Sequence, residues 1–145
     1  MSVQKAICRV GSSGIGIYIQ EKGTNLIYYS YKNLKKRSGL DIVFSNDQKL
    51  DWTNTYTIAD PSCSITVVVL KNNEEVGVKP FQSTKTDINY KEPIYFLCFD
   101  AQQQLKIDTA KSLQDMDEYP ERYNHIKDGS LIFNNTWNDF FGIRL

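Results

Sequence analysis

Two tryptophans set among polar residues are the side chains whose types and spacing most clearly suggest chemistry. Trp52 lies in the run Asp51-Trp52-Thr53-Asn54, and Trp137 lies in Asn134-Asn135-Thr136-Trp137-Asn138-Asp139. An indole ring can cover the apolar C–H face of a sugar while amides and carboxylates bind its hydroxyl groups. We therefore expect a glycan-binding site made of Asp51, Trp52, Asn54, Asn135, Trp137, Asn138 and Asp139. The alternative is that each tryptophan packs at the margin of the core.

A basic cluster beside three tyrosines is a second candidate contact surface. Its four positive charges lie within six residues. Such a cluster can attract an anionic headgroup or a phosphorylated partner, and tyrosine rings suit a membrane interface. The expected contact residues are Tyr28, Tyr29, Tyr31, Lys32, Lys35, Lys36 and Arg37. A solvated loop is the alternative, because the chain has no net positive charge to support the cluster.

Nucleophilic catalysis would depend on His125, the single histidine of the chain. Every Ser–His or Cys–His scheme needs it as the base, and no local motif surrounds it. The glycine-rich run at residues 11–16 continues into strand-like residues, whereas a phosphate-binding loop requires a Lys, a Ser or Thr and a helix. The many carboxylates single out no hydrolytic pair. From these observations we expect that the chain is not an enzyme.

Acidic residues near the ends of expected strands are the candidate metal ligands. One group is Ser45-Asn46-Asp47 with Asp51, and the other is Asp100 with Asp108. Calcium needs several converging oxygen ligands, and neither group follows the spacing of an EF-hand. We expect no cofactor and no metal, with calcium as the open alternative.

The cysteines and the first residues predict the compartment. Cys8, Cys63 and Cys98 are far apart, with no C-x-x-C pair for zinc or redox chemistry. No apolar signal-peptide core follows Met1. We expect reduced thiols, no disulfides and a cytoplasmic location, with leaderless export left open.

The composition excludes several classes of protein. The chain has 145 residues, and 17 Lys and Arg balance 17 Asp and Glu. Nucleic-acid binders usually carry a basic excess, so no nucleic-acid partner is expected. No stretch reaches the roughly 20 apolar residues of a membrane span. The length predicts one domain over residues 1–145, large enough to bury a core without disulfides.

Alternating apolar residues predict that strands dominate the chain. Residues 14–20 and 26–31 alternate around a short loop that contains glycine, which predicts a hairpin. A second hairpin is expected between residues 64–70 and 76–80, because the intervening Asn-Asn pair tolerates a tight turn. Pro80 cannot donate to a sheet, which predicts a strand end or an edge there.

The remaining elements complete an all-β fold with one helix. Residues 94–99 are apolar on both faces and predict a central strand covered on both sides. Pro120 and its acidic neighbours predict one short helix near residues 112–127. Weaker strands are expected at 6–10, 41–44, 56–59, 105–109, 131–133 and 140–145. The sum is an antiparallel β-sandwich or squat barrel of about 8–10 strands.

The leading functional hypothesis is a non-catalytic, lectin-like recognition module that binds a glycan or another protein. One alternative is a structural or self-assembling subunit of a virion, a coat or a secretion apparatus, and therefore a homo-oligomer. A neutral charge lowers self-repulsion, and exposed strand edges can pair between chains. The other alternative is a membrane-recognising or pore-forming β-protein that uses the tyrosines and the basic cluster.

Overall fold

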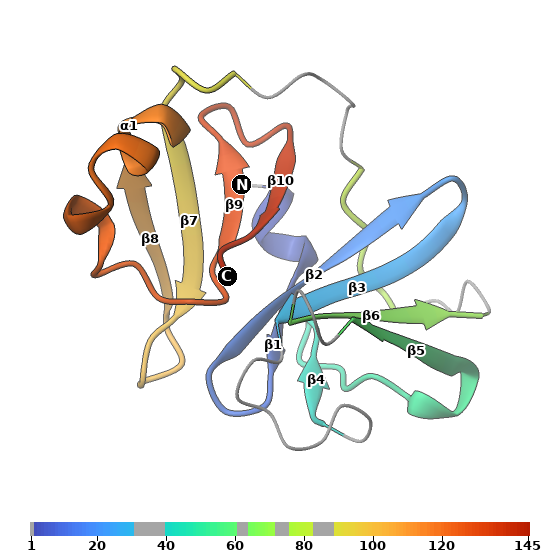
Figure 1. Cartoon of the computed structure of the whole chain (residues 1–145). Helices are drawn as coiled ribbons and strands as arrows, with labels where there is room; N and C mark the ends of the chain where they lie inside the picture. Colours follow the sequence, from blue (N-terminus) through green and yellow to red (C-terminus); the bar gives the residue numbers. More distant parts are fainter. Residues whose placement is uncertain (1, 31–39, 61–63, 72–75, 83–88) are drawn as a thin grey trace.

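Two antiparallel sheets make up the architecture of the chain (Figure 1). The computed structural model describes residues 2–30, 40–60, 64–71, 76–82 and 89–145. The first sheet has the strand order β4-β1-β2-β3-β6-β5 and the second has the order β10-β9-β7-β8. The strands of the first sheet are β1 (Ile7–Val10), β2 (Gly14–Glu21), β3 (Thr24–Ser30), β4 (Ile42–Val43), β5 (Thr55–Asp60) and β6 (Ile65–Leu70). The strands of the second are β7 (Ile94–Phe99), β8 (Leu105–Ala110), β9 (Leu131–Asn134) and β10 (Phe140–Ile143).

The hairpin of β2 and β3 is confirmed, and it forms because its turn residues adopt the required backbone geometry. The strands pair from Gly16↔Tyr29 to Glu21↔Thr24. Lys22 and Gly23 both have positive φ, at 49° and 80°. Positive φ at both central residues matches the right-handed twist of the flanking strands.

The glycine-rich run has a structural role in the turn between β1 and β2. Gly11 has a φ of 63°, and its N–H donates to the carbonyl of Asp41 at 2.8 Å. A Cβ on Gly14 would lie 2.6 Å from the carbonyl oxygen of Val10, so only glycine fits there. The run therefore lets the chain reverse tightly at this point.

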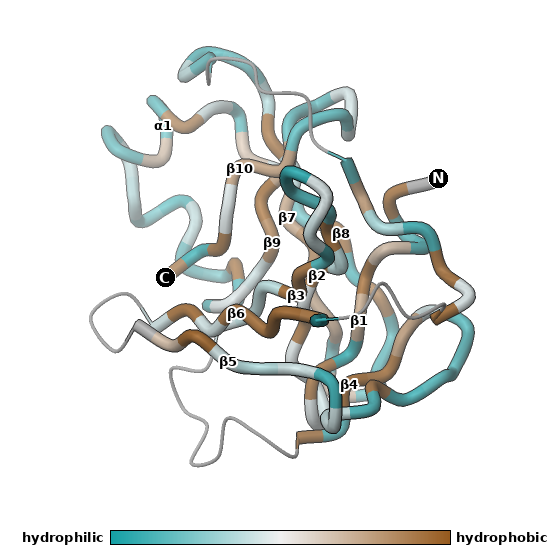
Figure 2. Tube along the Cα trace, turned by 90° about the vertical axis from the view of Figure 1, so that its right-hand side faces the viewer, coloured by the Kyte–Doolittle hydropathy of each residue, from teal (hydrophilic) through white to brown (hydrophobic). Residues whose placement is uncertain are grey.

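Four buried clusters hold the sheets, and the smallest consists of Ile19, Leu26 and Val69. The first sheet encloses one cluster: Cys8, Val10, Tyr18, Ile27, Tyr29, Ile42, Phe44, Leu50, Val68, Leu70 and Val76. A second cluster lies where the sheets meet: Val3, Ile7, Ile15, Ile17, Leu97, Leu131 and Phe133. A third lies on the outer face of the second sheet: Ile94, Phe96, Ala110, Tyr123 and Ile126. Figure 2 shows the apolar residues concentrated in the strands and the hydrophilic ones largely in the connections.

The prediction that residues 94–99 form a central strand is confirmed. β7 pairs with β8 on one side and with β9 on the other. Leu97 faces the first sheet, whereas Ile94 and Phe96 pack in the cluster with Tyr123 and Ile126. Both faces of the strand are covered, which explains its unbroken apolar sequence.

The expected hairpin between residues 64–70 and 76–80 is wrong. β6 is flanked by β3 and β5, so both of its edges are occupied. The chain instead crosses to β2, where Phe81 forms a parallel bridge with Ile19. This edge of β2 is open because β1 pairs with it only as far as Ile17. Alternation predicted a strand at residues 76–80, but the structure has bends at Gly77 and Val78 and a single bridge at Phe81. The pattern could not identify the pairing partner.

The helical region forms where it was expected, but in two pieces. Ser112 caps α1 (Leu113–Glu118) by accepting from the N–H of Asp115 at 2.9 Å. Pro120 then begins a 3-10 helix, η3 (Pro120–Tyr123), after a break at Tyr119. Two further 3-10 helices are η1 (Ser2–Ala6) and η2 (Trp52–Asn54). The fold prediction, an antiparallel β-sandwich or squat barrel of about 8–10 strands with one short helix, is confirmed.

None of the described helices has the length or the apolar character of a bilayer span. The α-helix of the described chain has six residues, against the roughly 20 that a span requires.

Candidate functional site: a groove between the sheets

An open groove of about 1340 Å³ lies where the two sheets meet, and we refer to it as the inter-sheet groove. Its walls come from η1, from the turn after β4, from the segment that pairs with β2, and from the turn between β9 and β10. The lining residues are Gln4, Lys5, Ala6, Ser45, Asn46, Gly77, Val78, Lys79, Pro80, Phe81, Gln82, Trp137 and Asn138. The groove therefore combines apolar surface with amide and ammonium groups.

A turn held together by side-chain hydrogen bonds places Trp137 at the groove. The side-chain oxygen of Asn134 accepts from the backbone N–H groups of Asn138 and Asp139, at 3.0 and 3.2 Å. The Asn134 amide donates to the carboxylate of Asp139 at 3.2 Å. Trp137 has a φ of 63°, a conformation that is unusual for a bulky side chain. Strained residues of this kind concentrate at functional sites, which makes the turn a candidate contact element.

Aromatic packing fixes the position of the Trp137 ring. The indole stacks on Tyr95, with ring centroids 4.7 Å apart, and lies 5.4 Å from the ring of Phe133. Phe133 in turn meets the Phe81 ring edge-on at 5.8 Å. One continuous aromatic contact thus connects the turn of the second sheet to the segment that pairs with the first.

A short segment that pairs with β2 through Phe81 forms one wall of the groove. Both backbone groups of Phe81 bond to β2: its N–H donates to Tyr18 and its carbonyl accepts from Gln20, at 2.8 and 3.0 Å. Successive residues of an extended chain turn their backbone groups to alternate edges. The carbonyl of Pro80 and the N–H of Gln82 therefore point away from β2, and both residues line the groove.

The first of the two tryptophan groups lies elsewhere. Trp52 is half-buried against the cluster inside the first sheet, and its Nε1–H donates to the carbonyl of Leu40 at 3.0 Å. Asp51 caps η2, and its carboxylate accepts from the backbone N–H and hydroxyl of Thr53. These bonds, the backbone one first, lower the pKa of Asp51. The backbone carbonyl of Asn54 accepts from the N–H of Lys71 at 2.9 Å.

The second group is divided between the groove and its support. Trp137 and Asn138 line the groove, Asp139 is buried in the turn, and Asn135 is exposed outside the lining. The structure does not bring Trp52 and Trp137 to one site, because they pack against different clusters. The expected seven-residue constellation is therefore split, and two of its members remain at the groove.

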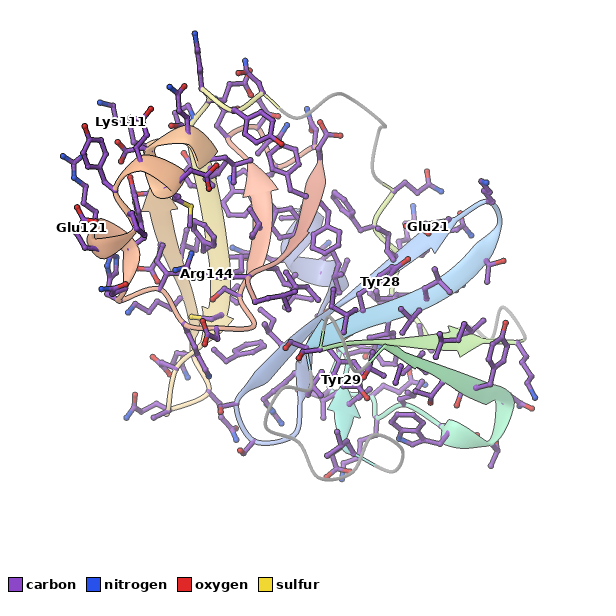
Figure 3. The ribbon with its side chains drawn as sticks, viewed as in Figure 1. Glu21, Tyr28, Tyr29, Lys111, Glu121 and Arg144 are labelled. Carbon is purple, nitrogen blue, oxygen red and sulfur yellow. The ribbon has the colours of Figure 1, made fainter. Side chains whose placement is uncertain are left out.

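The tyrosines of the basic cluster point in opposite directions. Tyr31, Lys32, Lys35, Lys36 and Arg37 lie outside the described residues. Tyr29 is buried inside the first sheet, whereas Tyr28 faces the second sheet and contacts Phe140, with ring centroids 6.4 Å apart. Tyr28 also donates to Glu21 at 3.1 Å along the hairpin (Figure 3). Burial, then the charge of Glu21 and its hydrogen bond, raise the pKa of Tyr28 to about 12.

Two of the candidate calcium ligands, Asn46 and Asp100, form hydrogen bonds with backbone groups. Asn46 accepts from the N–H of Gln48 and donates to the carbonyl of Val76. Asp100 accepts from the N–H groups of Gln102 and Gln104, both at 2.9 Å. Within the described residues, no group of three or more His, Cys, Asp or Glu side chains is placed to hold a metal ion.

A smaller pocket of about 310 Å³ brings together Cys98, His125 and Asp108, a combination that the sequence did not suggest. Cys98 is 5% exposed, and His125 is exposed on the loop after η3. Cys8 is fully buried inside the first sheet, and burial raises the pKa of its thiol. Nothing in the sequence links Cys98 to His125, because β8 and the helical region separate them.

Lys127 ties the two sheets together beside this smaller pocket. Its ammonium group donates to the carbonyl of Ser13 at 3.1 Å and to that of Phe99 at 3.2 Å. Ser13 belongs to the turn between β1 and β2, and Phe99 ends β7. One side chain thus connects the sheets whose junction forms the groove.

The comparisons with known proteins yield a fold likeness. No protein-family model matches the sequence, and no curated protein matches it. Among solved structures, the MamO protease domain from Magnetospirillum magneticum, in its apo form, matches with a TM-score of 0.61. The match covers 98% of this chain and 84% of that one, at 9% sequence identity. The fold resembles that of a protease domain.

This likeness corrects the expectation that the chain is not an enzyme. That expectation rested on the single histidine and on the lack of a local motif, but the architecture is one that a protease domain uses. At 9% identity the likeness concerns the fold and carries no residue roles across.

Proposed function

We propose that this chain binds polypeptides and holds an extended segment in the inter-sheet groove. The observation that carries the proposal is the groove itself, with a volume of about 1340 Å³ and a wall that pairs with β2 through Phe81. Pockets for small molecules typically span roughly 300–1,000 Å³. A groove beyond that range suits a chain of several residues better than one compact ligand.

The backbone of the groove supports this choice of ligand. The Pro80 carbonyl and the Gln82 N–H point away from β2, to which their segment is bonded through Phe81. An extended peptide can add to such an edge by main-chain hydrogen bonds, while neighbouring pockets select its side chains. The large ring of Trp137 stacks on Tyr95. A peptide could therefore contact this ring with little loss of side-chain conformational entropy.

The fold likeness also supports a polypeptide ligand. The matched structure is described as a protease domain, and the substrate of a protease is a polypeptide chain. The same assay that measures binding should therefore follow cleavage of the bound peptide.

The test uses random octapeptides labelled with fluorescein, with binding measured by fluorescence anisotropy and cleavage by mass spectrometry. We expect the wild type to bind a subset of peptides. Trp137→Ala and the groove-filling variant Asn138→Tyr should each weaken binding at least tenfold. Tyr56→Ala is the matched control, because Tyr56 is an exposed aromatic residue on β5, away from the groove. The proposal is overturned if no peptide binds, or if a folded Asn138→Tyr protein binds as well as the wild type.

A glycan ligand remains the second candidate, because Trp137 and Asn138 of the expected sugar site line the same groove. A glycan array probed with the wild type and with Trp137→Ala distinguishes the two. Trp137-dependent glycan signals without peptide binding would favour the glycan. Self-assembly, membrane recognition and a cytoplasmic location stay predictions from the sequence.

A further inference from the structure

We infer that the inter-sheet groove selects acidic segments, whose Asp or Glu side chains pair with Lys5 and Lys79. This inference rests on the proposed polypeptide-binding function and names the chemical class of the ligand.

The charge of the groove carries the inference. Lys5 and Lys79 are the charged side chains among the described lining residues, and no carboxylate is among them. The chain as a whole is neutral, with 17 charges of each sign, whereas the described lining carries two positive charges and no negative one. Complementary potential across an interface favours a ligand of the opposite sign and excludes one of the same sign.

Both ammonium groups are available to a ligand. Lys5 and Lys79 are exposed, and neither forms an ion pair with another residue in the described ranges. Lys49, by contrast, pairs with Asp41 at 3.6 Å, and Lys127 donates to two carbonyls. A ligand carboxylate at the groove would thus gain partners that the protein itself does not occupy.

Two described carboxylates, Asp47 and Asp139, directly follow lining residues in the sequence, and each has other contacts. Asp139, next to Asn138, is 6% exposed and accepts from the Asn134 amide. Asp47, next to Asn46, lines a different pocket with Arg9. Neither is among the groove-lining residues, so neither neutralises the two lysines from within the lining.

Several other polar groups of the lining are already used by the fold. The Ser45 hydroxyl donates to the carbonyl of Lys5 at 2.6 Å, and the Asn46 amide donates to Val76. The Gln82 amide donates to Gln20 at 2.8 Å. The two ammonium groups therefore remain the strongest free donors, and charged donors make the stronger hydrogen bonds with carboxylates.

The test compares three matched fluorescein-labelled octapeptides that share one apolar backbone sequence and differ at two positions, which hold Glu, Gln or Lys. We expect affinity in the order Glu, Gln, Lys, and a loss of Glu-peptide affinity as salt rises, because surface charges are screened over about 10 Å at 0.1 M. The double variant Lys5→Gln/Lys79→Gln should weaken the Glu peptide about tenfold, at roughly threefold per exposed pair. The Gln peptide should be unaffected.

Lys49→Gln is the matched control, since it removes one lysine that already has a partner. The charge reversal Lys5→Glu/Lys79→Glu should move the preference to the Lys peptide. If Glu and Gln peptides bind equally well, or if Lys49→Gln weakens the Glu peptide as much as the double variant, the acidic selectivity is overturned and polypeptide binding stands. If none of the three peptides binds while random octapeptides do, the selectivity fails alone. If no peptide of any kind binds, the proposed function itself fails.

Discussion

The indole of Trp137 lies stacked on the ring of Tyr95, with centroids 4.7 Å apart and planes 23° from parallel. Tyr95 belongs to the central strand β7 and pairs there with Phe133 of β9. The contact thus anchors a strained turn residue to the middle of the second sheet. Its position decides which surface the groove offers to a ligand.

Removing the stack should loosen Trp137. Tyr95→Leu keeps an apolar side chain but loses the ring, so we expect a loss of about 1 kcal/mol in the free energy of unfolding. The Trp137 emission should shift to longer wavelength, and peptide affinity should fall. Urea unfolding followed by fluorescence, in a Trp52→Phe background in which Trp137 is the single tryptophan, measures the free energy and the emission, and the anisotropy assay measures the affinity. Tyr90→Leu is the control, because Tyr90 is 58% exposed. An unchanged emission and affinity in Tyr95→Leu would contradict the role of the stack.

Removing the ammonium group of Lys127 should uncouple the sheets. Lys127→Met keeps the aliphatic stem and deletes two donors to Ser13 and Phe99. Because the side chain is exposed, we expect a modest loss of about 1 kcal/mol in the free energy of unfolding. Amide hydrogen exchange should quicken in the turn between β1 and β2. Lys106→Met is the control, since Lys106 lines the same small pocket. If Lys127→Met and Lys106→Met lowered the free energy of unfolding equally, Lys127 would not connect the two sheets.

The free energy of unfolding should fall at alkaline pH because the pKa of Tyr28 is raised in the folded protein. Its pKa is about 12 in the folded protein, raised by burial, by the charge of Glu21 and by their hydrogen bond, against about 10 in the unfolded chain. The folded protein therefore keeps this proton between pH 10 and 12, where the unfolded chain releases it. Stability is accordingly highest below pH 10 and falls as the pH rises towards 12.

Urea midpoints between pH 9 and 11.5 measure this dependence. Tyr28→Phe should flatten it, although the other tyrosines still titrate. Glu21→Gln should move the Tyr28 titration, followed by absorbance at 295 nm, to lower pH. A Tyr28→Phe curve parallel to that of the wild type would show that Tyr28 titrates as an ordinary exposed tyrosine.

Local patterns were sufficient to predict most of the elements. The hairpin expected from residues 14–20 and 26–31 formed between β2 and β3 in the described part of that stretch, because the alternation and the glycine of the turn lie close together in the sequence. Residues 94–99 formed a central strand because a run that is apolar on both faces has to be covered on both. The hairpin expected at residues 76–80 failed, because both edges of β6 are taken, one by the preceding strand β5 and the other by the more distant β3.

The candidate site could be predicted only in part. Trp137 and Asn138 were found by their composition, but the same reasoning ranked Trp52 equally, and Trp52 packs against the core of the first sheet. No pattern in the sequence marked Lys5 or Lys79 as a candidate binding residue. They are ordinary surface lysines until the fold places them on one groove.

The sequence by itself determined the strands, the turns and the mostly β class, because these depend on the period of apolar residues and on backbone preferences within a few positions. Tertiary structure decided the groove. β1 pairs with β2 only as far as Ile17. Phe81 pairs with β2 beyond that point, and the turn that carries Trp137 lines the same groove as Phe81. Pairings between distant segments depend on which edges remain free after all strands are placed, and no local pattern records that.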